Sequence, residues 1–151
     1  MPIDHADRMT ATEPTSAPAR LVRFEHVNLA CRDLDATRSF YALLFPDWRV
    51  RASGRDADTG SRWMHFGNDA FYVALNDKPE QVRAHRRYEQ IGVNHVGFVI
   101  DDGAAMQARL AANNLRFYTL LSRETAHRIY VEDPDGNEVE LVEYHPDYPL
   151  R

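Results

Sequence analysis

The feature that most constrains the fold is an internal repeat. The segments His26-Val-Asn-Leu-Ala-Cys-Arg-Asp33 and His95-Val-Gly-Phe-Val-Ile-Asp-Asp102 both begin with His-Val and both end at an aspartate. Alternate positions in each segment are apolar, which predicts a strand with one face toward a core. The opposite faces carry small or polar residues beside the histidine. The chain therefore contains two copies of one supersecondary unit.

Each copy continues with the same order of elements. The stretches LDATRSFYALLF and GAAMQARLAANN follow the two aspartates and have helical spacing of apolar residues, so Asp33 and Asp102 are the expected N-caps. Three short extended segments follow each helix, near 47–53, 61–67 and 70–76 in the first copy and near 116–121, 127–132 and 137–144 in the second. The sequence Asp133-Pro-Asp-Gly136 predicts a hairpin turn between the last two.

These elements predict an α+β fold of two βαβββ modules. We place the modules at residues 21–77 and 93–145, joined by a linker at 78–92, in a single domain at 21–145. Residues 1–20 contain three prolines and no apolar period, so we expect a flexible N-terminal tail there. We expect residues 146–151 to be a C-terminal tail.

Composition and charge exclude several classes of function. The 151 residues are 44% hydrophobic, and 18 basic against 23 acidic residues give a net charge of −5. This mild acidity argues against nucleic acid or an anionic membrane as partner. The chain has neither a long apolar run nor a secretory leader, so we expect a cytoplasmic protein. The single cysteine, Cys31, is expected to be a buried thiol under the first helix.

The polar faces of the repeat predict a metal site. His26 and His95 occupy matching positions, and the strand parity of the last segment puts Glu140 on the histidine side. Two imidazoles and one carboxylate with open positions suit Fe, Mn, Ni, Co or Zn as divalent ions. Counting through the repeat puts Tyr72 at the fourth corner of this site, where it would pack over a substrate or donate a hydrogen bond to it.

Other polar residues are candidates for contact with a substrate. His65 lies on a middle strand and is a candidate general base, and Tyr130 is a candidate donor to a metal-bound oxygen. His127 and Arg128 are candidates to hold an anionic group of the substrate. Asn28 lies on the polar face two residues after the first histidine. For each of these residues a packing or surface role is an equally open interpretation.

Three stretches resemble the signature sequences of a known family. HVNLACRDLDATRSFY, NHVGFVIDD and YVEDPDGNEVEL are similar to those of the vicinal oxygen chelate superfamily, which includes glyoxalase I, fosfomycin-resistance thiol transferases, bleomycin-binding proteins and extradiol dioxygenases. The resemblance covers about residues 22–144. It implies that the paired modules form a cup-shaped mixed β-sheet with helices outside, and that His26, His95 and Glu140 bind one divalent metal ion.

The resemblance also sets expectations for function. It implies a metal-dependent, glyoxalase (lactoylglutathione lyase)-like enzyme acting on a small, oxygen-chelating substrate. Glyoxalase I carries a metal ligand at the position matched to Tyr72, so this chain departs from that enzyme. The alternatives are an extradiol-type dioxygenase, a thiol transferase, or a metal-free ligand-binding protein. We expect a homodimer, with the cup formed either within one chain or across two.

Overall fold

A computed structural model describes residues 21, 23–78, 87–89 and 91–149. The expected N-terminal tail and most of the linker lie outside these residues. The first module contains β1 (His26–Cys31), α1 (Leu34–Leu44), β2 (Arg49–Arg55), β3 (Arg62–Gly67) and β4 (Tyr72–Asp77). The second contains β5 (His95–Val99), α2 (Gly103–Ala112), β6 (Phe117–Thr119), β7 (Thr125–Glu132) and β8 (Glu138–Tyr144). The predicted α+β class and the two βαβββ modules are confirmed.

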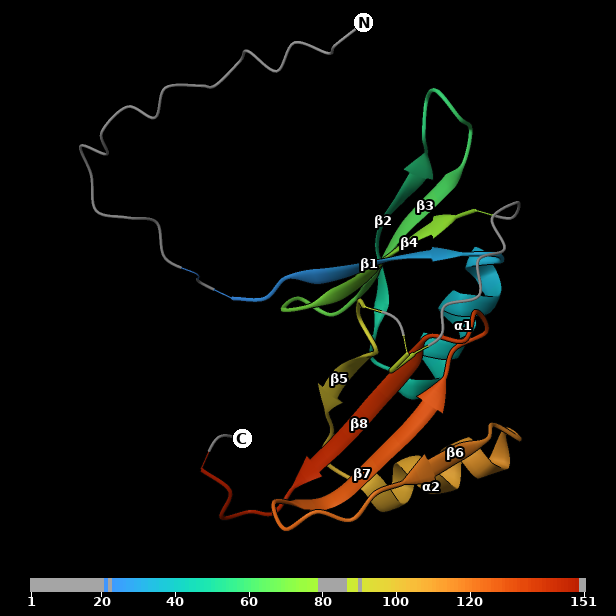
Figure 1. Cartoon of the computed structure of the whole chain (residues 1–151). Helices are drawn as coiled ribbons and strands as arrows, with labels where there is room; N and C mark the ends of the chain where they lie inside the picture. Colours follow the sequence, from blue (N-terminus) through green and yellow to red (C-terminus); the bar gives the residue numbers. More distant parts are fainter. Residues whose placement is uncertain (1–20, 22, 79–86, 90, 150–151) are drawn as a thin grey trace, which may run out of the picture.

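Each module forms its own four-stranded sheet. The strand order is β1-β4-β3-β2 in the first sheet and β5-β8-β7-β6 in the second. Strand β1 runs parallel to β4, and β5 runs parallel to β8, whereas the other neighbouring pairs are antiparallel. The two sheets lie one above the other in Figure 1, with α1 beside their junction. As a result β1 and β5, which carry the two repeat histidines, are both edge strands.

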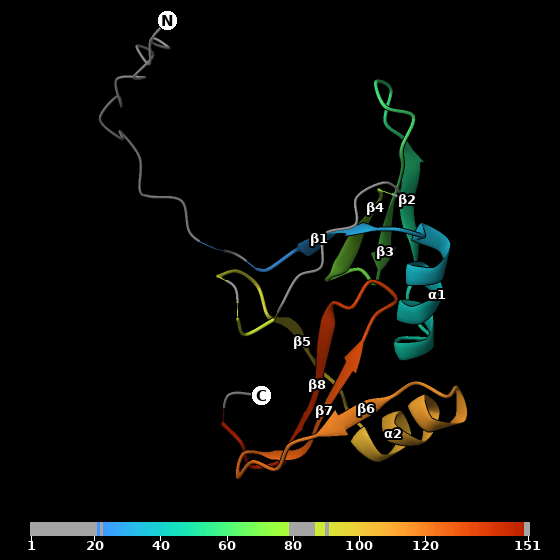
Figure 2. The same ribbon diagram turned by 45° about the vertical axis from the view of Figure 1, so that its right-hand side comes forward.

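The helices begin where the two aspartates predict. The Asp33 carboxylate accepts hydrogen bonds from the backbone N–H groups of Asp35 and Ala36, and the Asp102 carboxylate accepts one from Ala105. These bonds satisfy N–H groups that have no partner within the helix. In Figure 2, α1 and α2 lie on the same side of the molecule, and each packs on the sheet of its own module.

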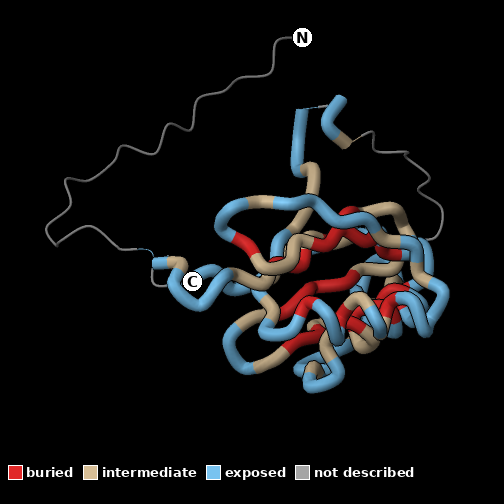
Figure 3. Tube along the Cα trace, turned by 90° about the horizontal axis from the view of Figure 1, so that it is seen from below, coloured by how far each residue is buried: buried red, intermediate tan, exposed pale blue. Residues whose placement is uncertain are grey.

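The core is continuous through both modules. The apolar faces of the sheets pack against the buried side chains of the helices, as the strand parity predicts; Figure 3 shows the buried segments along the strands and helices. Phe98 of β5 packs against three aromatic rings of the first module, with ring centroids 5.0 to 5.8 Å apart, namely Phe45, Trp48 and Phe71. Packing of these partly buried rings fixes one module against the other.

Two polar contacts add to the junction of the modules. The turn at residues 133–136 forms as predicted, with Gly136 at φ +82° donating its N–H to the Asp133 carbonyl. The Asp135 carboxylate in this turn accepts hydrogen bonds from the Arg32 backbone N–H and from its Nε at 2.8 Å. Arg109 of α2 donates to the Leu44 carbonyl at the end of α1. Among the described residues no helix has the length and apolar character needed to cross a bilayer.

Candidate functional site

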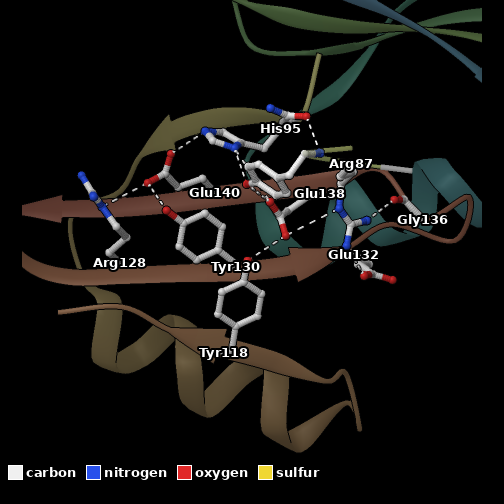
Figure 4. A network of polar contacts seen from close by, with 11 residues as sticks. Arg87, His95, Tyr118, Arg128, Tyr130, Glu132, Gly136, Glu138 and Glu140 are labelled. Carbon is white, nitrogen blue, oxygen red and sulfur yellow. Dashed lines mark hydrogen bonds and ion pairs between the residues drawn. The ribbon is translucent and has the colours of Figure 1, made fainter. Parts of the chain in front are cut away.

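The polar face of the second sheet gathers a cluster of titratable side chains. Register places His95 opposite Glu138 on β8, and Tyr130 of β7 opposite Glu140. Figure 4 shows these side chains on the face of the sheet that is turned away from α2. His95 and Glu140, both predicted metal ligands, are therefore neighbours in this chain.

The geometry of His95 and Glu140 fits a divalent ion. His95 Nε2 lies 3.0 Å from Glu140 Oε2. Two ligand atoms that are each about 2.1 Å from one ion are about 3 Å apart when they meet at a right angle. The imidazole and the carboxylate side chains are 33% and 13% exposed, so both remain accessible to an ion from solution.

The other Glu140 oxygen is held by neighbouring residues. Oε1 accepts a hydrogen bond from the Tyr130 hydroxyl at 2.9 Å. Arg128 Nε lies 3.1 Å from the same oxygen, an ion pair whose angle does not make a hydrogen bond. Burial, together with the hydrogen bond to Glu140, raises the pKa of Tyr130 to about 12, so its hydroxyl stays a donor at neutral pH. These contacts leave Oε2 as the free ligand oxygen.

His26 is held in a similar way on the first sheet. Its Nδ1 lies 3.0 Å from Glu25 Oε2, and its ring stacks on Tyr72 with centroids 4.8 Å apart. A hydrogen bond from the imidazole lowers the pKa of Glu25, so the carboxylate accepts and Nδ1 donates. The Nε2 atom of His26 is then left with its lone pair free.

Register corrects the expected place of Tyr72 in the repeat. Tyr72 pairs with His26 as Glu138 pairs with His95, whereas Ala74 pairs with Asn28 as Glu140 pairs with Gly97. The counterpart of Glu140 is thus Ala74. Counting residues gave the wrong partner because the segment between the paired strands is longer in the first module than in the second.

A small side chain at Ala74 leaves a hollow of about 310 Å³ on the first sheet. His65 lies opposite Ala74 in the register and lines this hollow with Trp63, Asn28 and Asn76. Desolvation, with the nearby His26, lowers the pKa of His65, so its imidazole is neutral at pH 7. His65 and Asn28 therefore lie together on the polar face, as strand parity predicts.

His127 lies on the other face of its sheet. Its Nδ1 is 2.7 Å from Glu143 Oε2, and that carboxylate also accepts from the Gly103 N–H at the start of α2. A side chain at Gly103 would collide with the His127 ring. The register from His127 to Tyr130 is regular, so alternation along β7 puts His127 on the face opposite to Arg128 and Tyr130, where it holds α2 rather than a substrate.

The candidate residues thus form two groups. His26, Asn28, His65 and Tyr72 lie on the first sheet, whereas His95, Arg128, Tyr130 and Glu140 lie on the second. Within the part of the chain that the structure describes, no group of three or more His, Cys, Asp or Glu side chains converges on one metal position. The three expected ligands do not meet within one chain.

Three residues of the cluster, Glu138, Tyr88 and Tyr118, were not found from the sequence. Glu138 is 3% exposed and accepts hydrogen bonds from the hydroxyls of Tyr88 and Tyr118. Its spacing from Glu140 puts it on the same strand face, a signal that was available in the sequence. Tyr88 belongs to the linker, where no periodic pattern indicates a place in the site.

Comparison with known proteins now decides the family. The family model described as Glyoxalase/Bleomycin resistance protein/Dioxygenase superfamily matches residues 23–141. The chain belongs to this superfamily. A search of curated proteins found no match.

Solved structures of the superfamily share the fold. A glyoxylase/bleomycin resistance protein/dioxygenase domain from Frankia sp. EAN1pec is 21% identical, with a TM-score of 0.70 over 83% of this chain and 100% of that one. The fosfomycin resistance protein FosX from Listeria monocytogenes, complexed with Mn(II) and sulfate, is 18% identical, with a TM-score of 0.64 over 87% and 100%. Lactoylglutathione lyase from Agrobacterium tumefaciens is 23% identical, with a TM-score of 0.60 over 83% and 96%.

Proposed function

We propose that this chain is a divalent-metal-dependent enzyme with glyoxalase-like lyase or isomerase chemistry, acting on a small substrate that binds through oxygen atoms. The observation that carries the proposal is the pair of His95 Nε2 and Glu140 Oε2 at 3.0 Å, each backed by hydrogen bonds on its far side. A divalent ion at this pair would stabilise negative charge on a substrate oxygen. The similar fold of FosX, solved with Mn(II), supports an ion of this kind.

The third ligand would be His26 of a second copy. His26 and His95 lie on β1 and β5, which are edge strands of separate sheets in one chain. Joining β1 of one copy to β5 of another in a two-fold dimer pairs both edges and brings His26 of one copy to His95 and Glu140 of the other. Val99, the last residue of β5, has an apolar side chain that is 67% exposed. Such a dimer would cover it. The proposed assembly is therefore a homodimer with two shared sites.

The polar residues around the metal would bind the substrate and move a proton. His65, neutral at pH 7, would accept a proton from a substrate seated in the hollow at Ala74. Arg128 would hold an anionic group of the substrate, since its side chain is 30% exposed beside Glu140. Tyr130 would keep the carboxylate of Glu140 oriented. The hollow lies at Ala74, the position in the first module that corresponds to Glu140 in the second.

A metal-free ligand-binding protein is the rival function. Trp63, His65 and Tyr72 form a continuous aromatic wall on the first sheet, and the Arg51 guanidinium lies 4.6 Å from the centre of the Tyr72 ring. Such a wall suits a flat or anionic ligand without any metal. Extradiol dioxygenase and thiol-transfer chemistry would use the proposed metal site itself, so the identity of the metal separates them from the lyase.

The test is metal content measured by elemental mass spectrometry, combined with mixing of variants. The protein is purified without chelators or a His-tag, and we expect about one equivalent of transition metal per chain. His26→Ala and Glu140→Ala should each lose the metal. When the two variants are unfolded together and refolded as a mixture, each mixed dimer regains one complete site, so about a quarter of the wild-type metal should return.

The outcomes separate the models. Metal that returns on mixing supports a site shared between copies. No metal in either single variant and none after mixing would contradict the shared site and place the three ligands in one chain. No metal in the wild type, even after addition of Fe, Mn, Ni, Co or Zn, would overturn the enzyme proposal in favour of the ligand-binding protein.

A further inference from the structure

The linker between the modules reaches back to a candidate metal ligand. The Tyr88 hydroxyl lies 3.0 Å from His95 Nδ1 and 2.6 Å from Glu138 Oε2. The Tyr88 backbone N–H donates to Asn94 Oδ1 at 2.7 Å. The neighbouring Arg87 donates to the Gly136 carbonyl and to Glu132, contacts that Figure 4 shows beside Glu138. The linker residues 87 and 88 are thus fixed on the polar face of the second sheet.

The backbone of Tyr88 adopts a conformation that needs support. Its φ is +62°, in the left-handed region that a bulky side chain rarely adopts. Backbone of this kind persists where surrounding contacts hold it, and it is frequent at functional sites. At Tyr88 the supporting contacts are the hydrogen bonds of its N–H and of its hydroxyl. The strained residue is therefore the one that contacts His95.

The direction of the hydrogen bonds follows from the chemistry of Glu138. Its ionised carboxylate only accepts, so the Tyr88 hydroxyl donates its proton to Glu138. The Tyr88 oxygen then accepts from the Nδ1–H of His95. With the proton held at Nδ1, the lone pair of a neutral imidazole lies at Nε2, where a divalent ion would stand between it and the Glu140 oxygen 3.0 Å away. Without an ion the Glu140 carboxylate only accepts, so it competes with Tyr88 by accepting from an Nε2–H.

We infer that Tyr88, backed by Glu138, is a positioning residue that holds His95 in the Nδ1–H tautomer with Nε2 presented to the metal. The ligand role of His95 in this inference rests on the proposed function. In the first module a carboxylate holds the histidine without an intervening side chain, since Glu25 contacts Nδ1 of His26 directly. In the second module a tyrosine stands between imidazole and carboxylate, and it comes from the linker rather than from a strand.

Tyr118 provides a matched control. Its hydroxyl donates to the other Glu138 oxygen at 2.8 Å, and its ring stacks on Tyr130 with centroids 4.8 Å apart. Tyr88→Phe and Tyr118→Phe each remove one hydroxyl donor from Glu138 and leave an aromatic ring in place. Only Tyr88→Phe removes the partner of His95 Nδ1.

The first measurement is Co(II) affinity of the full-length protein by calorimetric titration, with the visible spectrum of the bound Co(II) as a second readout. Loss of such a supporting partner costs about 10–100-fold in metal affinity. We expect a loss of this size and an altered spectrum for Tyr88→Phe, and a change within about threefold for Tyr118→Phe. Equal affinity in the wild type and Tyr88→Phe, or equal losses in both variants, would overturn the inference.

The second measurement needs no metal. Nitrogen-15 chemical shifts of the metal-free protein at about pH 8.5, where histidines are neutral, report the tautomer of His95, assigned by its loss in His95→Gln. Because the Glu140 carboxylate favours the Nε2–H tautomer when no metal is bound, we expect a mixture of tautomers in the wild type and in Tyr118→Phe, and a smaller share of the Nδ1–H tautomer in Tyr88→Phe. An unchanged share in Tyr88→Phe overturns the inference. If the wild type binds no Co(II), the proposed function fails, and this measurement still decides whether Tyr88 positions His95.

Discussion

Both candidate metal-binding histidines are held through Nδ1, and by different partners. Glu25 contacts His26 directly. Tyr88 contacts His95 and donates its own hydroxyl proton to Glu138. A carboxylate behind a metal-bound imidazole orients the ring and makes it a better ligand. Each module thus supplies one imidazole whose Nε2 is left to face a ligand.

The thiol of Cys31 gives a prediction at the same scale. The side chain is 2% exposed beneath α1, and desolvation raises the pKa of the thiol to about 11. Because the thiolate is the reactive form, we expect no reaction with Ellman's reagent at pH 8 in the folded protein. Because the pKa is raised in the folded state, burial of the neutral thiol stabilises the fold fully below the ordinary thiol pKa, near 8.5. This stabilisation is lost as the pH rises toward 11.

The measurement is the absorbance change with Ellman's reagent. In guanidinium chloride the chain should react with one equivalent, because it has a single cysteine. Rapid reaction of the folded protein at pH 8 would contradict the buried position of Cys31. A slow reaction whose rate equals the global unfolding rate is consistent with it.

At the scale of elements, the end of α1 depends on a residue of α2. The last turn of α1 has no basic residue of its own, and Arg109 Nη1 donates to the Leu44 carbonyl at 3.0 Å. A cation at a helix C-terminus binds carbonyl groups that have no partner in the helix. The contact therefore joins the two helices as well as ending one of them.

Arg109→Ala should lower the free energy of unfolding by about 1 kcal/mol, because a carbonyl loses its partner and the helix loses a favourable charge. Urea denaturation followed by circular dichroism measures this change. Arg123→Ala is the control for loss of one positive charge, since within the described residues the structure gives Arg123 no hydrogen bond or ion pair. Equal midpoints for Arg109→Ala and the wild type would show that the contact adds no stability.

Strand register separates what the sequence predicted, the face of a residue on its strand, from what it did not predict, the pairing of distant strands. The alternation of apolar residues predicted the face of Glu140, because parity is a local property of a strand. It did not predict that Ala74 matches Glu140, because pairing between distant strands depends on the lengths of the connections between them. His127 and Arg128 were both taken as substrate candidates, although neighbouring residues of a strand face opposite ways and His127 lies on the face of α2.

For the whole molecule, the contact between Arg32 and Asp135 joins the modules at the turn between β7 and β8. The Asp135 side chain is 12% exposed and accepts from both the backbone N–H and the side chain of Arg32. Asp135→Ala removes these hydrogen bonds, and because Arg32 is exposed, water can replace them in part, so we expect a loss of about 1 kcal/mol in the free energy of unfolding.

Thermal and urea unfolding measure this loss, and Asp147→Ala is the matched control. Asp147 is exposed and, within the described part of the chain, its side chain has no hydrogen bond or ion pair. Because one core runs through both modules, Asp135→Ala should still unfold in a single transition. A wild-type midpoint for Asp135→Ala would show that the contact between Arg32 and Asp135 adds no stability to the junction.

The sequence by itself determined the elements and their faces. The repeat, the apolar alternation and the capping aspartates are local patterns, and hydrogen bonding and side-chain burial within a few residues are enough to predict them. The tertiary structure alone decided which polar residues are neighbours. It separates His26 from His95 and Glu140 onto two sheets, and it brings Tyr88 from the linker to His95. These contacts join residues that are distant in the chain, and their geometry depends on packing of whole modules rather than on any local pattern.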